Sequence, residues 1–165
     1  MAMRTHPPAE PMERVLVIKR AFEAPARVIS QAWTRKDQLL RWWAPKGFTT
    51  PWCELDVRPG GTFRVCMRSP DGREHWSQGI FLEIVDGERI LFTSASEDAQ
   101  GRPGHETLVT VTLIEEDGKT KLTLYQAVFE SVAARNAQKE RWLSSLDRLA
   151  EHVTPQEHRS RPGRL

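Results

Sequence analysis

The clearest hydrophobic pattern in the chain lies near its C-terminal end. Trp142, Leu146, Leu149 and Val153 recur at intervals of four, three and four residues. This spacing is typical of the apolar face of an amphipathic helix. It predicts a long helix over residues 133–153, whose apolar face must pack against the rest of the chain.

The residues before this helix show mainly the pattern of β-strands. Apolar and polar residues alternate in short segments, and turns rich in glycine, proline and aspartate separate these segments. The predicted strands are 14–22, 52–57, 62–68, 76–85, 89–94, 107–113 and 120–126. Short turns join successive strands, so the sheet is expected to be antiparallel. The alternation predicts that only one side of the sheet is buried.

Two short helices are predicted between the first and second strands. Pro25 suits the first turn of one helix, where its missing N–H is not needed. Asp37 is a candidate N-cap for the second helix, over 38–43. Two adjacent tryptophans, Trp42 and Trp43, end this helix and cannot both face the same side of it. Either one of them is exposed, or the helix is packed on two sides.

The order of these elements predicts an α+β fold in one domain. The length of 165 residues suits a single domain with a substantial core. We expect the domain to span 13–153. The flanking segments 1–12, with three prolines, and 154–165, which is basic, show no periodic pattern and are expected to be disordered tails.

The composition is that of a globular protein, with 39% apolar and 28% charged residues. The net charge of +2 is too small to indicate nucleic-acid binding, and much of the excess lies in the tail 158–164. The chain lacks a run of about 18 apolar residues, so no membrane insertion is expected. Its first residues do not resemble a signal peptide, which favours a cytoplasmic location.

The chemical motifs of common enzyme classes are absent from the sequence. It contains no nucleophile elbow, phosphate-binding glycine loop, zinc-binding histidine pair or dinucleotide fingerprint, so neither a cofactor nor a metal is expected. Cys53 and Cys66 face each other if a two-residue loop closes their hairpin. A glycine bulge at Gly61 would separate them. In a cytosolic setting, two free thiols are expected in either case.

Several inward-facing side chains are either core residues or the lining of a ligand cavity. Gln78 and Gln126 are in phase with apolar neighbours, so each amide must find hydrogen-bond partners. A satisfied core amide and a polar group in a cavity are equally compatible with this pattern. The cavity-lining candidates are Trp42, Trp43, Phe48, Phe63, Val65, Trp76, Gln78, Phe92, Gln126, Trp142 and Leu146.

Several motifs occur together in an order that resembles one protein family. They are APARV at 24–28, AWT at 32–34, LRWWAPKGF at 40–48, DVRPGG at 56–61, GIFLEI at 79–84 followed by ER at 88–89, and WLSSLDRL at 142–149. The chain resembles homologues of the C-terminal domain of the activator of the heat-shock protein 90 ATPase, within the START-like, or SRPBCC, superfamily. This resemblance covers about residues 13–153.

The resemblance implies a helix-grip fold, in which a curved antiparallel sheet of about six or seven strands holds a long C-terminal helix. It also implies a deep apolar cavity between the sheet and this helix, which the two short helices close at one end. Many relatives have glycine immediately before the tryptophan of the last helix, where this chain has Arg141. The arginine predicts a narrower or more polar cavity mouth. We expect Trp142 to overlook the cavity and the segment 146–153 to seal the core.

Three functions are compatible with these observations, because a fold does not determine a function. The favoured one is non-catalytic binding of a small apolar or aromatic ligand. The second is a cyclase, dehydratase or hydrolase that uses His75, Gln78, Glu106 or Tyr125 inside the cavity. The third is a co-chaperone that activates an ATPase of the heat-shock protein 90 type through surface contacts. A homodimer through an exposed tryptophan patch also stays open.

Overall fold

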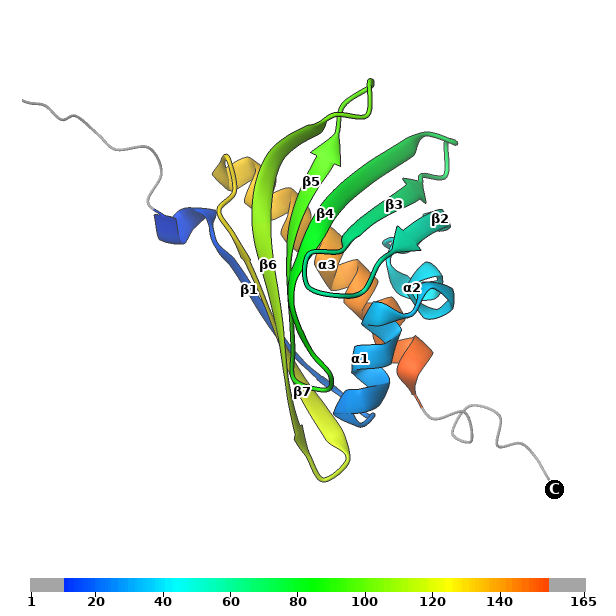
Figure 1. The fold of residues 1–165 in the computed structure, drawn as a ribbon, viewed down its shortest axis with the longest axis vertical. Coiled ribbons are helices and arrows are strands. Elements are labelled where there is room, and N and C mark those ends of the chain that lie inside the picture. The colour runs from blue at the N-terminus through cyan, green and yellow to red at the C-terminus, as the bar shows by residue number, and fades with distance from the viewer. Residues whose placement is uncertain (1–10, 155–165) are drawn as a thin grey trace, which may run out of the picture.

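The computed structural model describes residues 11–154, in which one seven-stranded sheet curves around a long helix (Figure 1). All strand pairs are antiparallel, as predicted, and the strand order is β1-β7-β6-β5-β4-β3-β2. The elements are η1 (Pro11–Arg14), β1 (Leu16–Phe22), α1 (Ala26–Thr34), α2 (Lys36–Trp42), β2 (Thr49–Leu55), β3 (Thr62–Arg68), β4 (Glu74–Val85), β5 (Arg89–Glu97), β6 (Pro103–Glu116), β7 (Lys119–Ala127) and α3 (Val132–Val153).

The alternation along the central strands places one face of the sheet against the helices. In β6, Val109, Val111 and Leu113 are buried, and they pair with or neighbour Leu122 and Leu124 of β7. The residues between them, Thr110, Thr112 and Thr123, point to the opposite side and are only half-buried. The prediction of a sheet buried on one side is therefore confirmed for these strands.

Helix α3 confirms the predicted apolar stripe and begins one residue earlier than predicted. The hydroxyl of Ser131 caps its first turn by accepting a hydrogen bond from the backbone N–H of Ala134 at 3.0 Å. Trp142, Leu146 and Leu149 are fully buried beneath the sheet. Since these residues share one face of the helix, that face seals the core along the C-terminal half of α3.

Helices α1 and α2 lie beside the C-terminal half of α3 (Figure 1). Pro25 is the N-cap of α1, directly before its first turn. The prediction that Asp37 caps α2 is wrong: Arg35 occupies the N-cap and Asp37 lies within the first turn. An aspartate there still interacts favourably with the positive end of the helix dipole.

Both Trp42 and Trp43 are buried, so the second alternative holds and the end of α2 is packed on two sides. The indole N–H of Trp42 donates to the carbonyl of Ala32 in α1 at 2.9 Å. The ring of Trp43 lies at centroid distances of 6.0 Å from Trp33 and 5.3 Å from Trp142. Four of the six tryptophans thus form one aromatic cluster where the three helices meet.

The register of the β2–β3 hairpin separates the two cysteines. Cys53 pairs with Val65, whereas Cys66 pairs with Trp52. The side chains of Cys53 and Cys66 therefore point to opposite faces of the sheet, and both thiols are free and buried. This outcome matches the alternative in which the register is shifted by one residue, and it confirms the expectation of free thiols.

The predicted phase of β4 is wrong. Phe81 is buried, while Ile80 and Leu82 are 41% and 46% exposed. Gln78, which has the same phase as Ile80, consequently lies on the outer face of the sheet rather than inside. Apart from Glu83, residues 79–85 are apolar or glycine on both faces, and a register shift between Phe81 and Glu83 interrupts the strict alternation, so the local pattern did not reveal the phase.

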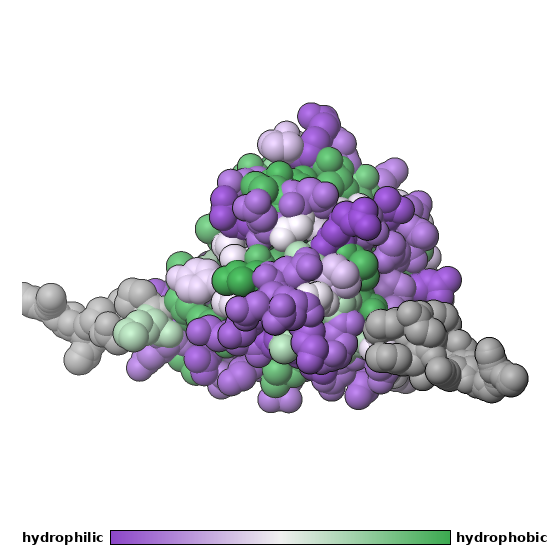
Figure 2. All heavy atoms as spheres, turned by 90° about the horizontal axis from the view of Figure 1, so that it is seen from below, coloured by the Kyte–Doolittle hydropathy of each residue, from purple (hydrophilic) through white to green (hydrophobic). Residues whose placement is uncertain are grey.

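Within residues 11–154, no helix has both the length and the apolar character that a bilayer crossing needs. Seen from below, hydrophobic residues are interspersed among hydrophilic ones (Figure 2). Of the segments predicted to be disordered, Pro11 and Met12 belong to η1. Residues 1–10 and 155–165 lie outside the described part of the chain.

Candidate functional site

A cavity of about 410 Å³ lies between the concave face of the sheet and the N-terminal half of α3. Strands β3 to β7 contribute its wall on the sheet side. The other wall consists of α3 and the two residues Phe129 and Glu130 that precede it. The cavity therefore lies next to the N-terminal half of α3, whereas the apolar stripe of the C-terminal half packs in the core.

The lining of this cavity is mixed in polarity. Hydroxyl groups line the sheet side and small or apolar side chains line much of the helix side. The hydroxyl residues are Ser77, Ser94, Ser96 and Thr107, and the apolar residues include Met67, Phe129, Ala134 and Ala137. Such a lining suits a molecule that has both an apolar body and polar groups.

Arg141 of α3 also lines the cavity. Its guanidinium lies 4.9 Å from the ring centroid of Trp142 and 5.7 Å from that of Trp43. Its hydrogen-bond partners are Gln138 Oε1, at 3.2 Å, and Met67 Sδ, at 3.7 Å. Burial lowers the pKa of Arg141 to about 10, because removal from water disfavours its charged form. Arginine at this position therefore places a charged, polar side chain in the lining of the cavity.

Gln126 of β7 is a buried amide at the boundary between the cavity and the core. Its Nε2 donates to Thr107 Oγ1 at 2.9 Å, and its Oε1 accepts from Trp142 Nε1 at 2.8 Å. These two bonds fix the orientation of the amide. Gln126 is therefore both a satisfied buried amide and a cavity-lining residue, so the two predicted roles are combined.

Three other titratable side chains line the cavity: His75, His105 and Glu130. His105 Nε2 is 2.7 Å from the carbonyl oxygen of Val128, and the ring of His75 lies 6.0 Å from that of Phe48. In residues 11–154 no three His, Cys, Asp or Glu side chains are grouped as a metal site would require. The arrangement offers polar contacts to a ligand without a metal-binding cluster in this region.

Of the four residues predicted to supply chemistry inside the cavity, only His75 lines it. Tyr125 and Glu106 are exposed on strands β7 and β6. Their inward neighbours in the alternation are Gln126 and Thr107, which do line the cavity. Gln78, the fourth residue, lies on the outer face.

A second, much smaller void of about 20 Å³ lies deeper, among the aromatic side chains. Four of the predicted lining residues surround it: Trp43, Phe63, Val65 and Phe92. Within the described residues, the indole N–H groups of Trp33 and Trp43 have no hydrogen-bond partner. This region is closely packed aromatic core, in which little space is left for a ligand.

The remaining predicted lining residues have different environments. Trp42, Trp142 and Leu146 are buried in the core and Phe48 is half-buried, and none of the four lines either space. Gln126 and Trp76 are the predicted residues that contact the large cavity, although the ring of Trp76 packs beside Arg64 and Trp52 on the outer face of the sheet. The sequence interpretation missed the serines of β5, although Ser94 and Ser96 continue the inward phase of Ile90 and Phe92.

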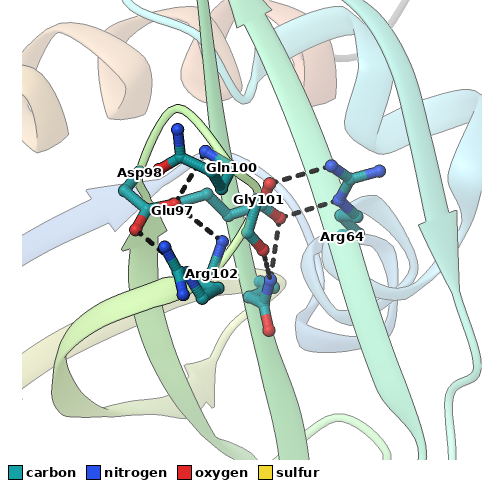
Figure 3. Close-up of polar contacts among 7 residues, drawn as sticks. Arg64, Glu97, Asp98, Gln100, Gly101 and Arg102 are labelled. Atoms are coloured by element: carbon teal, nitrogen blue, oxygen red, sulfur yellow. Dashed lines mark hydrogen bonds and ion pairs between the residues drawn. The ribbon is translucent and has the colours of Figure 1, made fainter.

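The outer face of the sheet carries a polar cluster around Glu97, whose side chain is only 2% exposed (Figure 3). Arg64 holds the two carboxylate oxygens at 2.7 and 2.8 Å, and Gln78 Nε2 donates to one of them at 2.9 Å. The Arg64 hydrogen bond lowers the pKa of Glu97. The Arg64 guanidinium also lies 4.1 Å from the ring centroid of Trp76, which packs against Trp52. Gln78 therefore has a structural role outside the cavity.

A curved antiparallel sheet that holds a long C-terminal helix defines the helix-grip class of START-like proteins. Within this class, residues 23–154 match the family described as "Activator of Hsp90 ATPase homolog 1-like protein". The chain belongs to this family, as its sequence motifs indicated. Comparison with curated proteins gives no match.

Solved structures of three bacterial proteins are similar to this chain over most of their length. The AHSA1 protein from Silicibacter pomeroyi has a TM-score of 0.78 and 25% identity, covering 84% of this chain and 96% of its own. A protein from Chromobacterium violaceum has a TM-score of 0.77 and 26% identity, covering 87% and 99%. A protein from Nitrosomonas europaea has a TM-score of 0.73 and 26% identity, covering 86% and 94%.

Proposed function

We propose that this protein binds a small amphipathic molecule, without transforming it, in the cavity between the sheet and the N-terminal half of α3. The observation that carries this proposal is the cavity of about 410 Å³ with its mixed lining. Small-molecule sites commonly have volumes of roughly 300–1,000 Å³ and combine an apolar lining with a few placed polar groups. The deeper aromatic region contains a void of only about 20 Å³, so it belongs to the packed core and is too small for such a ligand.

The titratable residues of the cavity favour binding over catalysis. A catalytic acid or base is normally oriented by a hydrogen bond to a second functional group. His75 and His105 are both exposed, and in the described structure no hydrogen bond or ion pair joins either of them to Glu130. The carbonyl of Val128, which contacts His105, is a backbone group. The cavity therefore resembles a recognition site more than an acid–base site.

The proposal can be tested with N-phenyl-1-naphthylamine, an uncharged aromatic probe whose fluorescence rises in apolar surroundings. We expect saturable binding by the native protein. Ala137→Phe should weaken this binding by about tenfold or more, because the added ring fills space in the cavity. Leu143→Phe is the matched control, since Leu143 is exposed on the same helix and does not line the cavity. Absence of binding, or equal affinity of the two variants, would contradict the proposal.

The family description supports a second candidate, co-activation of an ATPase of the heat-shock protein 90 type. Such an activity would depend on surface contacts and not on the cavity. It predicts that the protein stimulates the ATPase rate of a bacterial chaperone of this type, and that Ala137→Phe leaves the stimulation unchanged. If the purified protein produced no stimulation at saturating concentration, this candidate would be rejected.

A further inference from the structure

We infer that the ligand of the large cavity is an organic anion, and that Arg141 binds its negatively charged group. This inference rests on the proposed function, because it assigns the chemical class of the molecule bound at the same site. The ligand would have a carboxylate, sulfonate or similar group at one end and an apolar body at the other.

Arg141 carries a positive charge for which the described residues supply no negative partner. Within 11–154, no carboxylate forms an ion pair with its guanidinium. Its two polar contacts, Gln138 Oε1 and Met67 Sδ, are uncharged. A guanidinium has five N–H donors, so two contacts leave several donors unused. Arg141 is half-buried, and a charge partly removed from water without an ionic partner is costly, so an anion that entered the cavity would offset part of this cost.

Arg148 has a purely structural role and provides a comparison for Arg141. Arg148, two turns further along α3, donates to the backbone carbonyls of Arg41, Ala44, Pro45 and Phe48. It therefore links α3 to the end of α2 through the donors of its guanidinium. Arg141 makes no comparable set of bonds to the protein, although it lies on the same helix.

Arg64 and Arg20 are structural in another way, because each is neutralised by a carboxylate. Arg64 binds Glu97, and Arg20 binds Asp147. Arg141 differs from both of these arginines in lacking a carboxylate, and from Arg148 in lacking carbonyl partners. The only extensive contacts left to it are the aromatic rings and the cavity itself.

The rings of Trp43 and Trp142 position the Arg141 guanidinium at the edge of the cavity. Their cation–π contacts, at 5.7 and 4.9 Å, hold the planar group against the aromatic cluster. Trp142 is in turn fixed by its hydrogen bond to Gln126. A guanidinium held in this way is preorganised to bind the two oxygens of a carboxylate or sulfonate side by side.

The surrounding lining is compatible with an anion whose body is apolar. Glu130 is the one carboxylate among the lining residues, and it is exposed and forms no ion pair with Arg141. The histidines His75 and His105 add no negative charge. Ala137 and Ala134 lie one and two turns before Arg141 on α3 and offer a smooth surface for an apolar body.

Two matched probes separate this inference from the proposed function. N-phenyl-1-naphthylamine is uncharged, and 8-anilinonaphthalene-1-sulfonate has the same aromatic skeleton with one sulfonate. We expect the native protein to bind the sulfonate at least about tenfold more tightly, because an ionised hydrogen-bond pair is formed with a half-buried guanidinium. Arg141→Gln should abolish this preference and leave the affinity for the uncharged probe within about twofold.

Two further variants control for charge and for folding. Arg141→Lys retains the charge and should keep part of the preference, although a lysine cannot bind two oxygens with a planar fork. Lys139→Gln removes a positive charge from an exposed position of α3 outside the cavity lining, and it should leave the preference unchanged. The affinity for the uncharged probe reports whether each variant still forms the cavity.

The probe affinities distinguish failure of the inference about Arg141 from failure of the proposed function. If the native protein binds both probes equally, or if Arg141→Gln keeps the preference for the sulfonate, the inference is overturned while the proposed function stands. An equal loss of sulfonate affinity in Lys139→Gln would also overturn it, since general surface charge would then explain the preference. If neither probe binds, the proposed function fails and the inference fails with it.

Discussion

The indole N–H of Trp142 donates a hydrogen bond of 2.8 Å to Oε1 of Gln126, which joins α3 to β7 between the cavity and the core. The amide of Gln126 continues this connection to Thr107 of β6. A buried polar group is stable only when its partners are present. The chain of bonds therefore determines both how α3 sits on the sheet and how the inner end of the cavity is shaped.

We expect Gln126→Leu to lower the free energy of unfolding by about 1–3 kcal/mol, because the N–H of Trp142 would lose its partner and the hydroxyl of Thr107 would keep only its bond to the carbonyl of Ser94. Urea denaturation followed by circular dichroism measures this change. Trp142→Phe, alone and combined with Gln126→Leu, completes a double-mutant cycle that isolates the bond between them. Fully additive effects of the two substitutions would show that this bond does not couple α3 to β7.

Trp142 and Leu149 lie on the same buried face of α3 but at different distances from the cavity. Leu149→Ala should cost about 2–5 kcal/mol and Trp142→Ala about 3–5 kcal/mol of unfolding free energy, since both side chains are fully buried. Only Trp142→Ala should also weaken binding of the sulfonate probe, because Trp142 contacts both Gln126 and Arg141. Fluorescence titration at a temperature where both variants are folded compares them. Equal probe affinities would contradict this division along the helix.

The buried carboxylate of Glu97 should make stability depend on pH. Its hydrogen bond to Arg64 lowers its pKa in the folded protein, so the unfolded chain binds a proton more readily. The stabilisation is fully present above the unfolded glutamate pKa of about 4.3 and is lost as the pH falls through the lower, folded value. Glu97→Gln should therefore reduce stability at neutral pH and flatten its dependence on pH in this acid range.

Glu83→Gln is the matched control for this pH effect. Glu83 also pairs with an arginine, Arg89, but its side chain is 41% exposed. Solvent screens such a pair, so its removal should change stability and its pH dependence much less. Thermal unfolding between about pH 3 and pH 7 compares the two variants with the native protein. A larger effect of Glu83→Gln than of Glu97→Gln would refute the role assigned to the buried pair.

The two cysteines should behave as free but slowly reacting thiols. Burial raises the pKa of Cys53 and of Cys66, which disfavours the reactive thiolate of each. Titration with 5,5′-dithiobis(2-nitrobenzoate) should detect both thiols rapidly in the unfolded, unreduced protein and only slowly in the native protein. Finding fewer than two thiols after unfolding would contradict the register of the β2–β3 hairpin.

Local periodicity was enough to predict much of this fold, because α3 and the strands β6 and β7 each have one side toward the core. Leu146 and Leu149 follow the helical period, and Val109 and Val111 follow the period of a strand. The family motifs added the cavity and its position relative to α3. The sequence also singled out Arg141 as a polar departure at the cavity mouth.

Tertiary packing alone decided the roles of residues that have the same local pattern. Gln78 and Gln126 both alternate with apolar neighbours, yet Gln126 is buried beside Trp142 while Gln78 binds Glu97 on the outer face. The difference arises because β4 is apolar on both sides, so only its pairing with β3 and β5 determines which side faces the core.

The sequence by itself determined the order of the elements, the antiparallel sheet and the buried stripe of α3, because these follow from solvent contacting one side of each element. Only the tertiary structure decided that four tryptophans pack into a core and that the cavity lies beyond them. It also decided that Arg141 has no charged partner in the described chain. These features depend on contacts between side chains from distant segments of the chain, which local periodicity does not encode.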